Sequence, residues 1–440
     1  MKMAVRASAS RMLRRLPGLL LTAPGRCRLR KQLLDPIEPM LMRLAGTRRR
    51  FSGGSHRLIG VTGSYGKTTT ARAIRCALGG TAAATAGPNS GAALSRALLT
   101  QSFRAPYSVF ELGIGRLGQM APTARAFRPD VVVVTSIGGE HAVSLGTRER
   151  TREEKFELVR GMAPGGIAVL NGDDPHVRWM IDRTPGRVIT FGTGEGNDVR
   201  ADSMALDWPH GTRLEVRIGA WQGSARVRLV GDHVVYAILA ALAVAHAVGV
   251  APEVALARLT ELEPTPGRMQ VVALPGGAYL LRDEYKSGLE TIDRALELFA
   301  QIPAAHRIIV LGEITEPPSP QHPQYVALGQ RVAPLVDRAV VFGKKTDGYR
   351  TGLKRGGLAA DRIVDAGRSW RRAFDALDGT LVPGDVVLLK GRHDERLERV
   401  ALALAGHQVG CELVVCNTPL GRCDNCAMRE RGWGRIEPVY

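Results

Sequence analysis

A glycine-rich turn followed by a lysine and three threonines is the strongest chemical signal in the sequence. Residues 62–70 read Thr-Gly-Ser-Tyr-Gly-Lys-Thr-Thr-Thr, after an apolar run at 58–62 and before a segment typical of a helix. Backbone N–H groups of such a loop point toward anionic oxygens. Lys67 can then reach the terminal phosphates of a nucleotide, and Thr68 can bind Mg²⁺. The spacing departs from Gly-x-x-x-x-Gly-Lys, because Val61 stands where the first glycine belongs.

Four cysteines near the C-terminus form a second pattern with chemical potential. Cys411, Cys416, Cys423 and Cys426 are separated by four, six and two residues. A pair with two intervening residues is typical of ligands to Zn²⁺ or an iron–sulfur cluster. We therefore predict one structural Zn²⁺ in this tail, with redox-active disulfides and unliganded thiols as the alternatives.

Composition limits the class of protein that carries these motifs. The chain has 440 residues, of which 45% are hydrophobic and 23% charged, as in globular proteins of two or three domains. No apolar run reaches the roughly 18 residues of a membrane-spanning helix. Six cysteines are too few for a disulfide scaffold, so a reduced, cytoplasmic protein is predicted.

The net charge of +18 is concentrated at the N-terminus. Residues 1–57 contain fourteen Lys or Arg and two acidic residues, a net charge of +12. This distribution predicts contact between the N-terminal extension and an anionic membrane surface, at the inner face of the membrane. A solvated basic tail and an organellar transit peptide are the alternatives. Because the remainder is nearly balanced, no nucleic-acid partner is predicted.

Apolar runs alternate with helix-like segments and predict an α/β fold. We predict a central parallel-sheet domain that contains the phosphate loop, a smaller C-terminal α/β domain, and a Pro/Gly-rich linker at 264–268 between them. The predicted boundaries are 1–57 for the basic extension, 58–264 for the central domain, 265–406 for the C-terminal domain and 407–440 for the cysteine tail.

The motifs occur in an order that resembles the Mur ligases, the ATP-dependent amide ligases of peptidoglycan precursor synthesis. The loop 62–70 resembles their nucleotide loop, Glu111 resembles their acidic strand end, and 135–141 resembles their metal-binding histidine segment. Lys155 lies 14 residues beyond His141, the interval at which the family carries a modified lysine. Further matching segments are 171–174, 266–268, Tyr285 and 389–391. The strongest similarity is to the D-alanyl-D-alanine-adding branch, through 111–113, 311–313 and 389–392.

The resemblance implies a ligase that joins an amine to a carboxylate through an acyl phosphate, in cell-wall biosynthesis. It assigns catalysis to Lys67, His141 and Lys155, with Lys155 carbamylated, and acyl-side substrate contact to Asn89 and Ser90. The implied ATP-binding residues are Gly63, Ser64, Tyr65, Gly66, Lys67, Thr68, Thr69, Arg268 and Asp283. The implied Mg²⁺ ligands are Thr68, Glu111, His141 and Lys155. A solvent-facing Lys155 is the alternative, because its neighbours on the predicted helix are charged.

Three departures from the family pattern limit what the resemblance implies about substrates. Only a basic segment of about 55 residues precedes the phosphate loop, where the family has a nucleotide-sugar-binding domain. A UDP-linked substrate is therefore not implied. Val234 and Ala237 replace two amides expected near adenine, and Lys286 and Gly288 replace asparagines expected on the amine side. A ligase for another polymer or natural product, and a non-catalytic nucleotide-binding partner protein, are therefore kept as alternatives.

Overall fold

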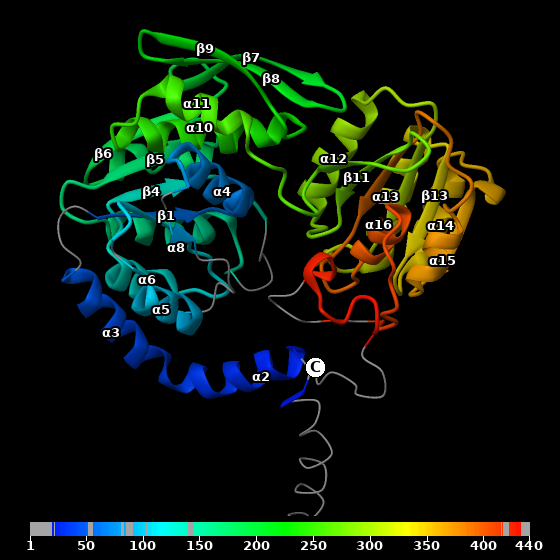
Figure 1. Cartoon of the computed structure of the whole chain (residues 1–440), viewed down its shortest axis with the longest axis horizontal. Coiled ribbons are helices and arrows are strands. Elements are labelled where there is room, and N and C mark those ends of the chain that lie inside the picture. Colours follow the sequence, from blue (N-terminus) through cyan, green and yellow to red (C-terminus); the bar gives the residue numbers. More distant parts are fainter. Residues whose placement is uncertain are drawn as a thin grey trace, which may run out of the picture. The chain divides into compact units, whose positions relative to one another are not determined.

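The computed structural model divides the chain into two compact units, shown in Figure 1. It describes residues 20–21, 23–51, 56–80, 83–84, 91–102, 104–139, 145–414, 416 and 422–432. Ile37–Thr265 form one unit, here called the central unit. The chain from Pro266 onward forms the C-terminal unit, with which helix α2 (Ala23–Leu34) is grouped. The change between units falls within the predicted Pro/Gly linker.

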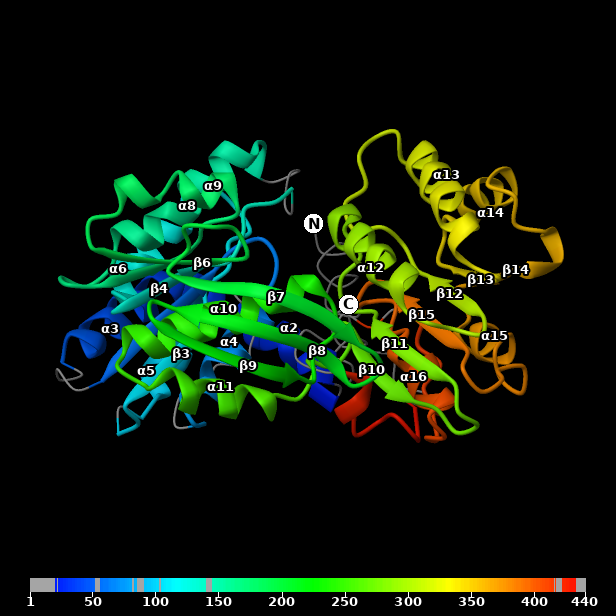
Figure 2. The same cartoon turned by 90° about the horizontal axis from the view of Figure 1, so that it is seen from above.

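The central unit is built on a sheet with nine strands among the described residues, in the order β2-β3-β1-β4-β5-β6-β7-β8-β9. Strands β2 to β7 pair in parallel, whereas β7, β8 and β9 are antiparallel and form the long ribbon in Figure 2. The strands are β1 (Arg57–Thr62), β2 (Ala83–Ala84), β3 (Tyr107–Glu111), β4 (Val131–Val134), β5 (Ile167–Asn171), β6 (Arg187–Gly192), β7 (Val199–Asp207), β8 (Gly211–Ile218) and β9 (Trp221–Val227).

Helices cover both faces of this sheet, because successive side chains of a strand point to opposite faces. In β4, Val131 and Val133 belong to one buried cluster, and Val132 and Val134 to the other. The helices are α3 (Glu38–Arg50), α4 (Lys67–Ala77), α5 (Gly91–Thr100), α6 (Met120–Phe127), α8 (Arg148–Arg160), α9 (Pro175–Arg178), α10 (Asp232–Ala247) and α11 (Pro252–Thr260).

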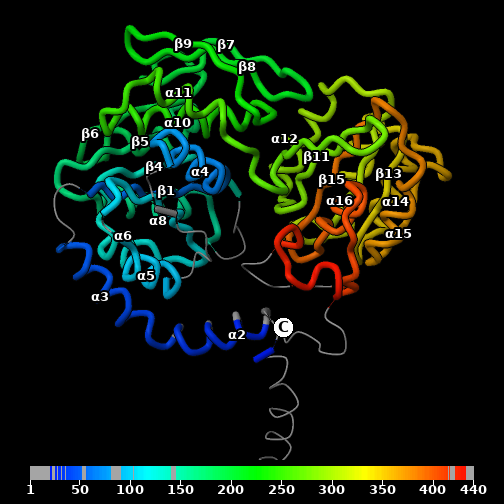
Figure 3. Tube along the Cα trace, in the orientation of Figure 1, coloured from blue at the N-terminus to red at the C-terminus, as the bar shows by residue number. Residues whose placement is uncertain are grey.

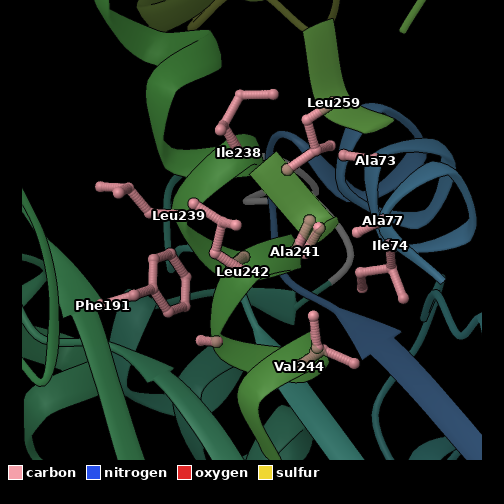
Figure 4. Packing of buried hydrophobic residues seen from close by; sticks show 14 of the residues in the cluster. Ala73, Ile74, Ala77, Phe191, Ile238, Leu239, Ala241, Leu242, Val244 and Leu259 are labelled. Atoms are coloured by element: carbon pink, nitrogen blue, oxygen red, sulfur yellow. The ribbon is translucent and has the colours of Figure 1, made fainter. Parts of the chain in front are cut away.

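Helix α10 is the buried centre of one of these layers. Its side chains Ile238, Leu242 and Val244 pack among residues of α4, β6 and α11, as Figure 4 shows for Ile74 and Phe191. The tube in Figure 3 shows α4 and α10 side by side although they lie far apart in the sequence. This packing fixes α4, whose N-terminus follows the phosphate loop, against the sheet.

Part of the predicted basic extension belongs to the central unit. Helix α3 packs on α5 and α6, and Met42, Ala45 and Arg49 of this helix are buried. This part of 1–57 is therefore not a solvated tail, because its folded core face holds it in place. No helix in the described portion of the chain is long and apolar enough to cross a membrane.

The C-terminal unit contains a second sheet with six described strands in the order β10-β11-β15-β12-β13-β14. All neighbours are parallel except β10 and β11. The strands are β10 (Gln270–Ala273), β11 (Tyr279–Asp283), β12 (Arg307–Leu311), β13 (Arg338–Phe342), β14 (Ile363–Gly367) and β15 (Val386–Lys390). The helices are α12 (Leu289–Gln301), α13 (Gln321–Val332), α14 (Thr346–Arg355), α15 (Trp370–Asp375) and α16 (Glu398–Leu404).

The described parts of the cysteine tail pack on the C-terminal unit. The indole Nε1 of Trp370 donates to the carbonyl oxygen of Cys411 over 2.9 Å, and Arg399 donates to the carbonyl oxygen of Leu413 over 2.6 Å. The Arg399 side chain is 2% exposed. Because the buried Arg399 guanidinium donates to backbone carbonyls of residues 411–413, this part of the tail belongs to the folded C-terminal unit.

Candidate active site

The phosphate loop follows β1 and is held against the end of β4. The backbone N–H of Ser64 donates to the carbonyl oxygen of Ser136 over 2.8 Å, and the N–H of Tyr65 donates to the Ser136 hydroxyl over 3.1 Å. Thr135 donates its hydroxyl to the Tyr65 carbonyl over 2.5 Å. Gly66, with φ of 80°, then begins helix α4. The segment that follows the neighbouring strand β4 thus braces the loop.

Gly63 is required by this close approach, and its substitution tests the loop's geometry. Its φ is 144°, and a Cβ would lie 1.9 Å from Oγ1 of Thr135. We expect Gly63→Ala to lower the free energy of unfolding by about 2–3 kcal/mol and to weaken ATP binding, because the loop must shift. The control is Gly115→Ala, whose Cβ would meet only the Gln119 side chain at 3.9 Å. Urea unfolding and nucleotide titration measure both effects; equal stabilities of the two variants would contradict the prediction.

Two lysines meet at one backbone carbonyl of this loop. Nζ of Lys67 donates to the carbonyl oxygens of Gly63 and Ser64 over 2.7 and 2.9 Å. Nζ of Lys155, on α8, donates to the same Gly63 oxygen over 2.8 Å. The two residues are 7% and 2% exposed. The structure therefore excludes the solvent-facing alternative for Lys155 and concentrates positive charge beside the phosphate loop.

Lys155 lies on the buried face of α8. The buried residues Thr151, Lys155 and Leu158 recur at the spacing of one helix face, which packs toward the sheet. Glu154 on the same face accepts hydrogen bonds from the N–H groups of Gly118 and Met120 over 2.8 and 2.7 Å. The acid thus caps the start of α6, a structural role that the charged sequence alone did not reveal.

Thr68 and Glu111 bring a hydroxyl and a carboxylate oxygen together beside the phosphate loop. Oγ1 of Thr68, in the first turn of α4, donates to Oε2 of Glu111 over 2.7 Å. Glu111 ends β3, which pairs in parallel with β1, so its carboxylate lies beside the loop that follows β1. Thr69 lies in the same first turn of α4. Hydroxyl and carboxylate oxygens are the donors that Mg²⁺ prefers, so the pair fits one such ion.

Asn171 and Asp174 hold the segment that follows β4. Nδ2 of Asn171 donates to the carbonyl oxygen of Thr135 over 2.8 Å, and Oδ2 of Asp174 accepts from the N–H of Ile137 over 2.8 Å. Asp174 also caps helix α9. These residues position the loop rather than line it. The predicted residues His141, Asn89 and Ser90 lie outside the described residues.

Asp173 and Tyr236 form a contact that sequence analysis missed. The Tyr236 hydroxyl, on α10, donates to Oδ2 of Asp173 over 3.0 Å, and Thr193 and Asn197 donate to the same carboxylate. Burial of Asp173 opposes ionisation, but these hydrogen bonds prevail and lower its pKa. Two signals were present in the sequence: Asp173 lies in the matching segment 171–174, and Tyr236 lies between Val234 and Ala237, which depart from the family pattern.

Arg268 and Asp283 come together in the C-terminal unit. The guanidinium carbon of Arg268 lies 4.5 Å from the ring centroid of Tyr285. Asp283, at the end of β11, accepts from the N–H of Met269 over 3.3 Å and forms an ion pair with Lys390, which is 1% exposed. The matched segments 266–268 and 389–391 thus meet at one end of β11 and β15.

A buried ion-pair network ties the tail to this same strand. Arg282 pairs with Glu284 and with Asp424, each over 2.7 Å, and Arg422 pairs with Glu284 over 3.3 Å. Arg282 and Glu284 are 5% and 0% exposed. Removal of one partner of a buried pair leaves an uncompensated charge, so the tail is strongly coupled to β11.

The four tail cysteines are all described and form no disulfide. Burial, and after it the charges of Cys411 and Cys416 among other groups, raise the pKa of Cys426. Within the described ranges, no three His, Cys, Asp or Glu side chains are gathered in a metal-binding arrangement.

The buried carboxyl of Glu395, close to the matching segment 389–392, predicts a pH-dependent stability. Burial raises the pKa of Glu395 to about 8, although the N–H groups of Arg392 and Glu313 donate to it over 2.8 and 2.9 Å. The folded state therefore holds a proton that the unfolded state releases above about 4.5. The free energy of unfolding should fall as pH rises from 4.5 to about 8, because the unfolded state binds fewer protons in this window.

Glu395→Gln should reduce this slope, measured by urea unfolding at several pH values. The control Glu297→Gln alters an acid whose side chain is 58% exposed and should keep the slope. An unchanged slope in Glu395→Gln would show that another group titrates.

Two family models match the chain. The Mur ligase middle domain matches residues 61–245, and the Mur ligase, glutamate ligase domain matches residues 267–393. These ranges fall inside the central and C-terminal units respectively. The gap between the matches, residues 246–266, ends inside the predicted linker.

Curated relatives match most of the chain. The chain is 30% identical over 373 residues to the UDP-N-acetylmuramoyl-tripeptide--D-alanyl-D-alanine ligase of Mycobacterium tuberculosis, covering 80% of this chain and 73% of that protein. It is 26% identical over 349 residues to the corresponding Bacillus subtilis ligase, covering 78% and 75%.

Solved structures show the same fold. A crystal structure of MurF from Acinetobacter baumannii has a TM-score of 0.75 at 23% identity, covering 83% of this chain and 80% of that one. MurF from Thermotoga maritima in complex with ADP has a TM-score of 0.71 at 24% identity, covering 84% and 83%.

Proposed function

Because the chain belongs to the Mur ligase family of ATP-dependent amide ligases, we propose that it joins an amino acid or peptide amine to the carboxylate of a cell-wall precursor. Ligases of the D-alanyl-D-alanine branch are similar to this chain, so a dipeptide amine and a peptidyl carboxylate are the first substrates to test. The observation that carries the proposal is the juxtaposition of Lys67, Lys155 and the Thr68–Glu111 pair around one phosphate loop.

The reaction requires two anions, a carboxylate and a triphosphate, to approach each other. A carboxylate oxygen attacks the γ-phosphorus, the bond to the β-phosphate oxygen breaks, and ADP leaves. The amine nitrogen then attacks the acyl carbon, loses a proton to solvent or a nearby base, and releases inorganic phosphate. Lys67 and the loop N–H groups offset the repulsion between the anions by fixed positive charge.

Thr68 and Glu111 would hold the Mg²⁺ that neutralises phosphate charge when it is bound. We propose that His141 and Lys155 supply a second Mg²⁺ site. A carbamate on Lys155 would bring an anionic oxygen to this position. In support, the unmodified Lys155 ammonium shares the Gly63 carbonyl with Lys67, so its conversion to an anion replaces a like-charge repulsion with an attraction.

We propose that Gly63, Ser64, Tyr65, Gly66 and Thr69 cradle the phosphates through their backbone, and that Arg268 and Asp283 contact the rest of the nucleotide. Asn89 and Ser90 are proposed for the acyl side of the substrate. The assignment of Arg268 to the nucleotide is supported by its stack on Tyr285, because a stacked guanidinium is a flat cationic surface of the kind that packs on a base or ribose.

The test is a screen of ATP hydrolysis and product formation with pairs of acid and amine. UDP-linked and UDP-free muramyl tripeptides, each with D-alanyl-D-alanine, are the first pairs. Amide product and ADP in equal amounts would support the proposal. Product with other acids only would favour a ligase for another polymer or natural product, as the replacements at Lys286 and Gly288 suggest. No turnover with any pair would favour the non-catalytic alternative.

We also propose one structural Zn²⁺ on Cys411, Cys416, Cys423 and Cys426. The spacing of the four cysteines supports it, because a pair with two intervening residues is typical of Zn²⁺ ligands. Elemental analysis of chelator-free protein should find about one Zn²⁺ per chain, and its removal should loosen the contact between Asp424 and Arg282. Metal-free protein with unchanged stability would contradict the assignment.

For the location, we propose the cytoplasm at the inner face of the membrane. The net charge of +12 in residues 1–57 supports it, because each basic residue near an anionic surface contributes about 1 kcal/mol before screening.

A further inference from the structure

The outward face of helix α3 carries an exposed apolar stripe. Ile37, Met40, Leu44 and Phe51 are 39%, 53%, 50% and 83% exposed. Met40 and Leu44 belong to α3, and Ile37 and Phe51 are its N-cap and C-cap residues. Their spacings of three, four and seven residues place all four on one side of the helix axis. Exposed large apolar side chains in the described part of the chain are concentrated in this N-terminal region.

The opposite face of α3 fixes the direction of this stripe. Met42 contacts Ser95 of α5, with 3.4 Å between the sulfur and the hydroxyl oxygen. At Gly46 the helix approaches α6 so closely that a Cβ would lie 3.3 Å from Cα of Ala126. Arg49 donates to the Phe127 carbonyl over 3.1 Å and pairs with Asp130 over 2.6 Å. Because this face is anchored, the stripe points away from the core.

The surroundings of the stripe are strongly basic. Helices α3, α5 and α6 contain six arginines and one acidic residue, Glu38, whose carboxylate lies beside Gly91. Arg43 and Arg50 on α3, and Arg96 on α5, are exposed. Figure 1 shows these three helices together on one side of the central unit, with α3 outermost.

We propose that this α3 face is a docking surface for an anionic membrane, with the apolar stripe at the headgroup level and the flanking arginines paired with lipid phosphates. The combination of an apolar stripe and basic flanks is what an interfacial helix requires. The proposal deepens the proposed membrane location and is independent of the ligation chemistry. In this proposal the membrane contacts a folded surface of the central unit, rather than a basic tail without a fixed position.

The test is sedimentation of the full chain with vesicles. The wild type should bind vesicles that contain phosphatidylglycerol and not vesicles of phosphatidylcholine alone. Leu44→Glu combined with Phe51→Glu should lower partitioning roughly tenfold or more. Arg43→Gln with Arg50→Gln should lower it in low salt and remove much of its salt dependence. The matched control, Val254→Glu, alters a side chain 42% exposed on α11 and should bind as the wild type does.

Unchanged ATP turnover and thermal unfolding would confirm that the variants are folded. Wild-type sedimentation of Leu44→Glu/Phe51→Glu would overturn the proposal, as would equal binding to neutral and anionic vesicles. A concentration-dependent dimer that the same double variant dissociates, without vesicle binding, would show that a second copy of the chain covers the stripe instead.

Discussion

Lys155→Ala should lose most ligation, roughly a hundredfold or more, while the protein remains folded and still binds ATP. Lys155 is 2% exposed and contacts the Gly63 carbonyl, so its loss empties a position beside the phosphates. Lys67 and Thr68 remain to hold the nucleotide. The measurements are amide formation, nucleotide titration and thermal unfolding.

Added small carboxylates distinguish a carbamate from an ammonium at this position. Acetate should partly restore Lys155→Ala by supplying the missing oxygen donor, and should not affect the wild type. Lys155→Arg should be inactive and not rescued, because the guanidinium stays charged and fills the space. Glu153→Ala, at a side chain 64% exposed on the same helix, is the control and should be active. Near-normal activity of Lys155→Ala without acetate would refute the role.

Lys67→Met should lose about 10²–10³-fold in ligation and also weaken binding of ATP. Methionine keeps the length and apolar packing of the stem but removes the charge that faces the phosphates. The same change removes the hydrogen bonds to Gly63 and Ser64, which brace the loop. Steady-state kinetics and nucleotide titration separate the two effects.

Acetate should not rescue Lys67→Met, because the lost group is a cation. The matched control is Lys354→Met, on an exposed position of α14, which should leave both measurements unchanged. Unweakened ATP binding in Lys67→Met would show that the lysine only braces the loop.

The phosphate loop could be predicted from the sequence because it depends on residue type and spacing within a short segment. A strand, a turn with glycines at 63 and 66 and a helix beginning at Lys67 follow from spacing and residue type, and the structure has them. The alternation of apolar runs predicted an α/β fold, and both sheets of the structure are mainly parallel with helices between the strands. The resemblance to the Mur ligases, which rests on ordered motifs, is confirmed by the family matches.

Contacts between distant segments were decided by the tertiary structure alone. No pattern in the charged segment 148–160 shows which side of α8 is buried, because its apolar periodicity is weak. The parallel order β3-β1-β4 brings Glu111 and the loop after β4 to the phosphate loop. Only this arrangement places Lys155 on the Gly63 carbonyl, 92 residues away in sequence.

The sequence of the N-terminal segment likewise predicted its charge but not its packing. Its composition determined a basic, partly apolar stretch, and hence an attraction to anionic surfaces. Composition did not show that α3 is folded, because its buried face has only small residues, Met42 and an arginine. The ion pair between Arg49 and Asp130 joins residues 81 positions apart, and burial against α5 and α6 orients the helix. Sequence therefore determined the charge of this segment, whereas long-range packing decided which side chains face outward.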